Sequence, residues 1–133
     1  MDLASKILIV GGLANLAYGF VNGLALSKIR LQSPDAPKYL VLAHIGALMQ
    51  GPMLLGLVWA VELSTLSPNT ETVAALLLVS ASFALGTKDT LNWLQGVRDE
   101  FAERSVGYYL GGLNVVLSSV GLGILIVGAV QGL

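Results

Sequence analysis

The stretch Val106–Val130, VGYYLGGLNVVLSSVGLGILIVGAV, decides the fold class because it contains no charged residue. A helix needs about 20 mainly apolar residues to cross a bilayer. Three earlier segments meet the same requirement, so we expect spanning helices at about residues 7–26, 39–61, 73–97 and 106–130. The sequence therefore predicts an all-α fold, namely an integral membrane four-helix bundle.

The composition supports a membrane protein and argues against several other classes. The 133 residues are 55% hydrophobic and 11% charged, whereas average soluble domains are roughly 25% charged. A net charge of −1 argues against a nucleic-acid-binding surface, and the absence of cysteine excludes disulfides and thiolate-bound metals. The connectors are short and carry turn signals such as Ser33-Pro34 and Ser67-Pro68. We therefore expect one transmembrane domain over residues 1–133, in contact with membrane lipid.

The distribution of positive charge predicts the orientation in the membrane. Cytoplasmic loops carry an excess of lysine and arginine. The first and third connectors hold most of these residues, and the opposite side holds only Lys6. The residues of the first group are Lys28, Arg30, Lys38, Arg98 and Arg104. We expect a multi-pass protein of the inner (cytoplasmic) membrane with both termini outside.

Polar residues gather in the cytoplasmic half or the midplane of all four predicted helices. Ionisable groups inside a membrane are costly, which makes them functional candidates. His44 is either a hydrogen-bonded core residue or a ligand or acid–base group. Asp89 either pairs with Lys88 or faces a cavity together with Asn92. The charged run 98–104 reads as a solvated loop.

Small residues recur at helical spacing along two of the predicted helices. Such stripes let helix backbones approach each other closely. One stripe includes Gly107, Gly111 and Gly121, and a shorter one consists of Gly19 and Gly23. They serve either packing within the chain or an oligomer interface. Because four helices enclose little interior, a cofactor or substrate site could need a neighbouring subunit.

A lone histidine in a chain without cysteine suits haem, which accepts a single proximal histidine. The segment Ser33–Gly51 also resembles the styrene oxide isomerase family of small four-helix bacterial membrane enzymes. In that family a short Ser-Pro loop precedes an Ala-His-x-Gly-x-x-x-Asn-Gly signature. This chain has Ser33-Pro34 and then Ala43-His44-Ile45-Gly46-Ala47-Leu48-Met49-Gln50-Gly51. The histidine, both glycines and their spacing match.

The resemblance implies a homotrimer that binds haem b between protomers. His44 would be the axial iron ligand, and Gly46 and Gly51 would belong to the cofactor-binding segment. The implied reaction converts a small apolar or aromatic epoxide to an aldehyde, with ferric iron as a Lewis acid. Gln50 takes the place of the family asparagine. Asp89 and Asn92 are the candidate groups on the other haem face, and with Gln50 they are the candidate catalytic residues.

The third predicted helix departs from the family pattern. Asn92 matches a family asparagine, but Lys88 stands at the family aspartate position with Asp89 beside it. Gly96 stands at the family tyrosine position, so Tyr18, Tyr108 or Tyr109 would have to substitute. Two other functions therefore remain open. One is a haem-binding sensor or electron-transfer protein without catalysis, and the other is a small-molecule transporter.

Overall fold

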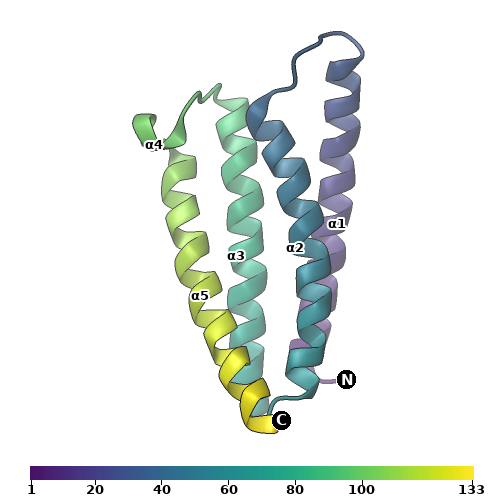
Figure 1. Ribbon diagram of the computed structural model, residues 1–133, viewed down its shortest axis with the longest axis vertical. Helices are drawn as coiled ribbons and strands as arrows, with labels where there is room; N and C mark the ends of the chain where they lie inside the picture. Colours follow the sequence, from purple (N-terminus) through teal and green to yellow (C-terminus); the bar gives the residue numbers. More distant parts are fainter.

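The computed structural model describes all 133 residues, and its only regular secondary structure is helical. Four long helices run up and down the molecule, and a single short turn of helix lies between the last two (Figure 1). They are α1 (Leu3–Arg30), α2 (Lys38–Glu62), α3 (Pro68–Leu94), α4 (Glu100–Glu103) and α5 (Val106–Gly132). The expected all-α four-helix bundle is thus confirmed, and each long helix is long and apolar enough to cross a membrane.

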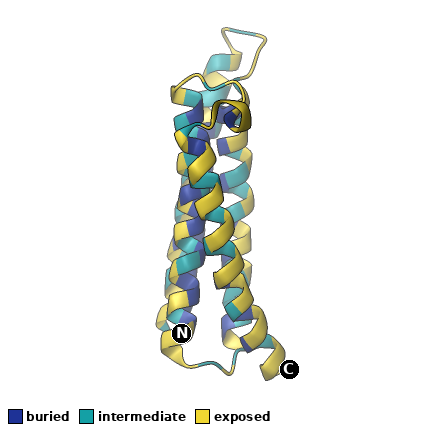
Figure 2. Ribbon diagram, turned by 90° about the vertical axis from the view of Figure 1, so that its left-hand side faces the viewer, coloured by how far each residue is buried: buried dark blue, intermediate teal, exposed yellow.

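The helices α1, α2 and α3 pack against one another, whereas α5 packs mainly on α3. Both chain termini lie at one end of the bundle, and the connector 31–37 and the short helix α4 lie at the other (Figure 1). Buried residues form an inner strip, and exposed residues cover the outer faces (Figure 2). Many exposed residues are large and apolar, for example Phe20, Leu24 and Trp59. Such faces suit contact with lipid tails.

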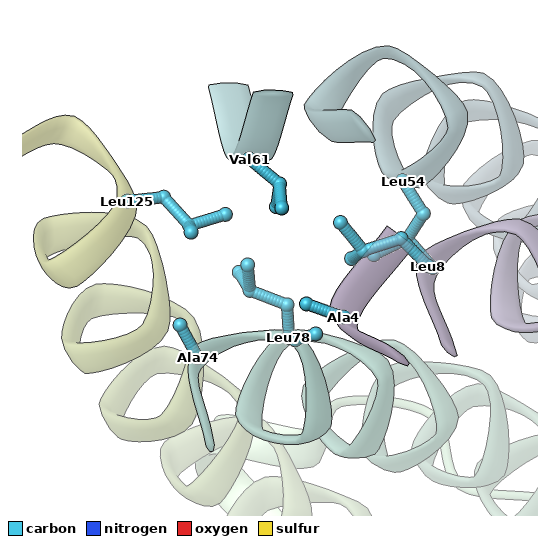
Figure 3. Packing of buried hydrophobic residues seen from close by; sticks show 8 residues of the cluster. Ala4, Leu8, Leu54, Val61, Ala74, Leu78 and Leu125 are labelled. Carbon is cyan, nitrogen blue, oxygen red and sulfur yellow. The ribbon is translucent and has the colours of Figure 1, made fainter. Parts of the chain in front are cut away.

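The hydrophobic core lies toward the end that holds the termini. Figure 3 shows Leu8 of α1, Leu54 and Val61 of α2, Leu78 of α3 and Leu125 of α5 pointing toward one another. Leu8, Leu54 and Leu125 are fully shielded from solvent. All four long helices contribute to this cluster, so it holds the bundle together at the end opposite the polar residues.

The helix ends differ from the expected bounds in ways that the local chemistry explains. Asp2 caps α1, since its side chain accepts a 2.7 Å hydrogen bond from the Ser5 amide, and the helix starts earlier than expected. Helix α3 was expected to reach residue 97, but it ends at Leu94. Gly96 adopts a φ of 65°, and the amides of Gly96 and Val97 bond back to the carbonyls of Trp93 and Asn92. This Schellman arrangement terminates the helix.

The small-residue stripe of α5 packs within the chain. Gly107 lies against Asn92 of α3, and Gly111 lies against the side chain of Lys88. A Cβ atom at Gly121 would lie only 3.0 Å from the carbonyl oxygen of Ala74. Of the two interpretations of this stripe, intramolecular packing against α3 is the one observed.

Candidate functional site

His44 lies half-buried on α2, against a notch in α1. Its Nδ1 atom is 2.7 Å from the carbonyl oxygen of Gly19. A carbonyl oxygen only accepts hydrogen bonds, so Nδ1 carries the proton and donates it. In the neutral ring Nε2 then keeps its lone pair, and no group of the chain bonds to it. The His44 side chain is therefore fixed in the tautomer that offers Nε2 as a ligand or acceptor.

Two glycines of α1 form the notch: Gly23 makes room for the ring, and Gly19 makes room for Leu48 and supplies the carbonyl oxygen that bonds to Nδ1. A Cβ atom at Gly23 would lie 2.7 Å from Cε1 and 3.0 Å from Nδ1 of His44. A Cβ atom at Gly19 would lie 2.8 Å from Cδ2 of Leu48, one turn further along α2. The Gly19/Gly23 pair seen in the sequence thus lets α1 and α2 pack closely. The missing side chains leave room for the His44 imidazole and for the side chain and backbone of Leu48.

The other signature residues of α2 lie in different surroundings. Gly51 is buried where α1 and α2 approach most closely, because a Cβ there would lie 3.1 Å from the carbonyl oxygen of Gly12. Gly46 has only Leu85 near it, at 3.9 Å from a Cβ. The side chain of Gln50 is half-buried and makes no hydrogen bond within the chain. Only Gly51 therefore has a packing role that demands glycine.

Asp89 and Asn92 lie buried on α3 and take part in one polar network. Asp89 Oδ1 is 3.3 Å from Lys88 Nζ, yet it accepts no hydrogen bond. Both ends of the Asn92 amide are engaged: Nδ2 donates to Glu100 Oε2 at 3.0 Å, and Oδ1 accepts from Ser105 Oγ at 2.8 Å. The ion pair left open by the sequence is therefore present, and Asn92 holds the α3–α5 connection in place.

Glu100 is the residue that the sequence interpretation placed wrongly. The run 98–104 was expected to be a solvated loop, but the Glu100 side chain is only 10% exposed. Its Oε1 atom is 2.7 Å from Lys88 Nζ, and its backbone amide donates to the Tyr39 hydroxyl at 2.9 Å. Helix α4 turns this carboxylate inward because Asp99 caps it at its start. A lysine as shielded from solvent as Lys88 requires a negatively charged partner. This requirement was the signal in the sequence that a nearby carboxylate would be buried with it.

The remaining polar residues join α1 to α3. Asn15 Nδ2 lies 2.9 Å from Ser82 Oγ, and the Tyr18 hydroxyl bonds to the Thr90 hydroxyl. Asn22 is buried with its Nδ2 unpartnered. All three of these α1 residues were expected to share one helix face, and the structure places each toward the interior or toward α3.

No group of three or more histidine, aspartate or glutamate side chains is placed to hold a metal ion. The comparisons give no further assignment: no family model, no curated protein and no solved structure matches the chain. The most specific feature of the site is the single histidine with an oriented ring and a free Nε2.

Proposed function

We propose that this chain is a haem-b-dependent membrane isomerase that converts a small apolar or aromatic epoxide to an aldehyde. The observation that supports the proposal is the His44 ring, whose Nδ1 donates to the Gly19 carbonyl oxygen at 2.7 Å. Histidines that bind metals almost always donate their other ring N–H to an oxygen, which orients the ring and strengthens the ligand. The donor set fits haem, since the porphyrin needs only one protein nitrogen.

A second copy of the chain is part of this proposal. None of the five cavities of the monomer is lined by His44. The residues Leu42, Ile45 and Met49 are exposed and apolar, and at 100° per residue they lie about 100–160° around α2 from His44, so they offer a face for another protomer. We propose a homotrimer with haem b between protomers, as the resemblance of the segment 33–51 implies.

The bound haem and the side chains of the chain would have different roles in the proposed reaction. Ferric haem, when bound, would supply a Lewis acid for the epoxide oxygen. The chain would exclude water through its apolar helix faces, which protects a carbocationic transition state from hydration. Asp89 has a buried carboxylate oxygen without a hydrogen bond, and Gln50 is half-buried on the helix that carries His44, so both would orient substrate. Asn92 would act through Glu100 and Ser105, which occupy its amide.

An absorption spectrum of the purified protein, expressed with an adequate supply of haem precursor, tests the proposal. We expect a Soret band in the wild type and its loss in His44→Ala, because no other residue of the chain is a histidine. Gln50→Leu is the matched control on the same helix: it should keep the Soret band and lower only epoxide turnover. A wild type without a Soret band would refute haem binding.

One observation favours a haem protein without isomerase activity as the second candidate. Gly96, at the position of the family tyrosine, lies beyond the end of α3 with a positive φ. Tyr18 is the tyrosine whose hydroxyl meets α3, through Thr90. If Tyr18 does not take the role of the family tyrosine, the protein would bind a full complement of haem and yet form no aldehyde from styrene oxide or alkyl epoxides. Product analysis by gas chromatography separates the two candidates.

We further propose that both termini lie outside the inner membrane, because the connectors near α4 and before α2 carry the positive charges. The chain lacks cysteine, so single cysteines report accessibility without background. In intact spheroplasts an impermeant maleimide should label Asn69→Cys at once and Asp35→Cys only after permeabilisation. Both positions are exposed. If Asp35→Cys were labelled at once and Asn69→Cys only after permeabilisation, both termini would lie inside and the proposed orientation would be wrong.

A further inference from the structure

A cavity of about 210 Å³ lies between α1 and α3, apart from His44, Asp89 and Asn92. Its walls include Asn15, Tyr18, Ser82, Phe83, Thr87 and Thr90. Phe83 and Thr87 are exposed, so the cavity opens on the outer surface of the bundle, which faces lipid in a membrane. Its walls combine apolar surface with polar but uncharged side chains.

Asn15 presents an unpartnered acceptor to this cavity. Its side chain is 3% exposed, and Nδ2 lies 2.9 Å from both the Gly11 carbonyl oxygen and Ser82 Oγ. Because the Gly11 carbonyl only accepts, the atom bonded to it must be the amide nitrogen, which fixes the orientation of the amide. Ser82 donates its own hydrogen to the Val79 carbonyl. Asn15 Oδ1 therefore accepts no hydrogen bond within the chain.

Tyr18 presents a second acceptor. The Tyr18 and Thr90 hydroxyls bond to each other, and they lie 3.4 and 2.9 Å from the Gly86 carbonyl oxygen. Whichever hydroxyl donates to that carbonyl, the one hydrogen of Tyr18 is donated within the chain, and its phenolic oxygen keeps at least one free lone pair. The exposed hydroxyl of Thr87, at the rim, is the remaining donor. The inner part of the cavity thus offers acceptors and calls for a ligand that donates a hydrogen.

We propose that this cavity binds a small apolar molecule with one hydroxyl group, an alcohol or a phenol, that enters from the lipid. No carboxylate or lysine lines the cavity, so a charged ammonium would lack compensation there. At about 30 Å³ per water-sized group, the volume suits a molecule of roughly seven or eight non-hydrogen atoms. Epoxides and aldehydes only accept hydrogen bonds, so the ligand that this cavity calls for differs from the substrate and the product of the proposed reaction.

A matched pair of probes tests this directly in the full-length protein in lipid nanodiscs. 4-Fluorophenol has the hydroxyl donor, and 4-fluoroanisole has the same ring without it. Fluorine NMR titrations, corrected for partition into empty nanodiscs, should show saturable binding of 4-fluorophenol that is about tenfold tighter than that of 4-fluoroanisole, as expected for one hydrogen bond.

Three variants assign the effect to the cavity. Asn15→Leu removes the acceptor and should bring the two affinities together. Gly86→Val should weaken both probes, because its added side chain would fill the cavity wall, where even a Cβ atom would lie 3.2 Å from the Tyr18 ring. The Asn15 side chain bonds to Gly11 and Ser82, so this substitution does not remove its partners. Asn114→Leu removes a comparable amide on α5, which bonds to the Ala81 carbonyl outside this cavity, and should change nothing.

Equal affinity of the two probes in the wild type, or only linear partitioning without saturation, would overturn the proposal and leave a lipid tail as the occupant. A preference that survives both Asn15→Leu and Gly86→Val would place the hydroxyl site elsewhere and also overturn it. The readout does not depend on haem. Failure here therefore leaves the proposed isomerase untouched, and a missing Soret band leaves this site untouched.

Discussion

We expect Glu100→Leu to destabilise the protein by about 3–5 kcal/mol, the usual result of removing one partner from a buried ion pair. Glu100 accepts from Lys88 and Asn92 at 2.7 and 3.0 Å. Without this carboxylate, Lys88 keeps only Asp89, 3.3 Å away and poorly aligned for a hydrogen bond. The Asn92 amide would lose its acceptor too. Unfolding in mixed detergent–SDS micelles, followed by circular dichroism, measures the change.

The neighbour Glu103 provides the control. It belongs to the same short helix and is exposed, and its Oε1 accepts from the amides of Arg98 and Asp99 at 2.9 and 3.1 Å. Glu103→Leu should therefore cost about 1 kcal/mol, as the loss of a helix cap does. Similar losses for the two variants would show that Glu100 is not the centre of a buried network.

This contrast also shows where sequence reasoning ends. The run 98–104 places charges of both signs in a short segment, and nothing local separates a buried glutamate from an exposed one. Burial of Glu100 follows from tertiary placement, because α3 brings Lys88 and Asn92 to the point where α4 turns. Lys88 was visible as an intramembrane cation. Its second partner depended on a fold of the connector that the sequence pattern does not encode.

The long helices, by contrast, were predictable from composition. The length of the four apolar segments alone indicates four membrane-spanning helices, since about 20 consecutive apolar residues are enough to identify one. The ends are less predictable because caps decide them. Gly96 ends α3 through its positive φ, and Asp2 starts α1 through its side chain. Neither the glycine nor the aspartate adds to the length of an apolar segment, so a search for apolar segments does not find these helix ends.

The candidate site was predictable in its residues but not in its geometry. His44 stands out as the lone histidine, and Gly19 and Gly23 stand out by their spacing. That the glycines hold the ring, and that the Gly19 carbonyl sets its tautomer, depends on the register between α1 and α2. Register arises from many side-chain contacts at once, so one sequence does not reveal it.

Gly23→Val tests this geometry and has the second large effect that we expect. A Cβ at residue 23 would lie 2.7 Å from Cε1 of His44, so the ring must move and its bond to the Gly19 carbonyl oxygen must break. Losing the group that orients a metal-binding histidine usually lowers metal affinity by about 10- to 100-fold. Titration of the purified apoprotein with haem should show a loss of this size.

A second readout does not require haem. Because the chain has one histidine, nitrogen-15 NMR of labelled protein gives a single imidazole. The wild type should show the proton on Nδ1, and Gly23→Val should shift it toward Nε2, since the Gly19 carbonyl no longer accepts it. Gly56→Val is the control on α2, where a Cβ meets nothing within 4 Å. An unchanged Nδ1 proton in Gly23→Val would contradict the notch, whatever the haem titration gives.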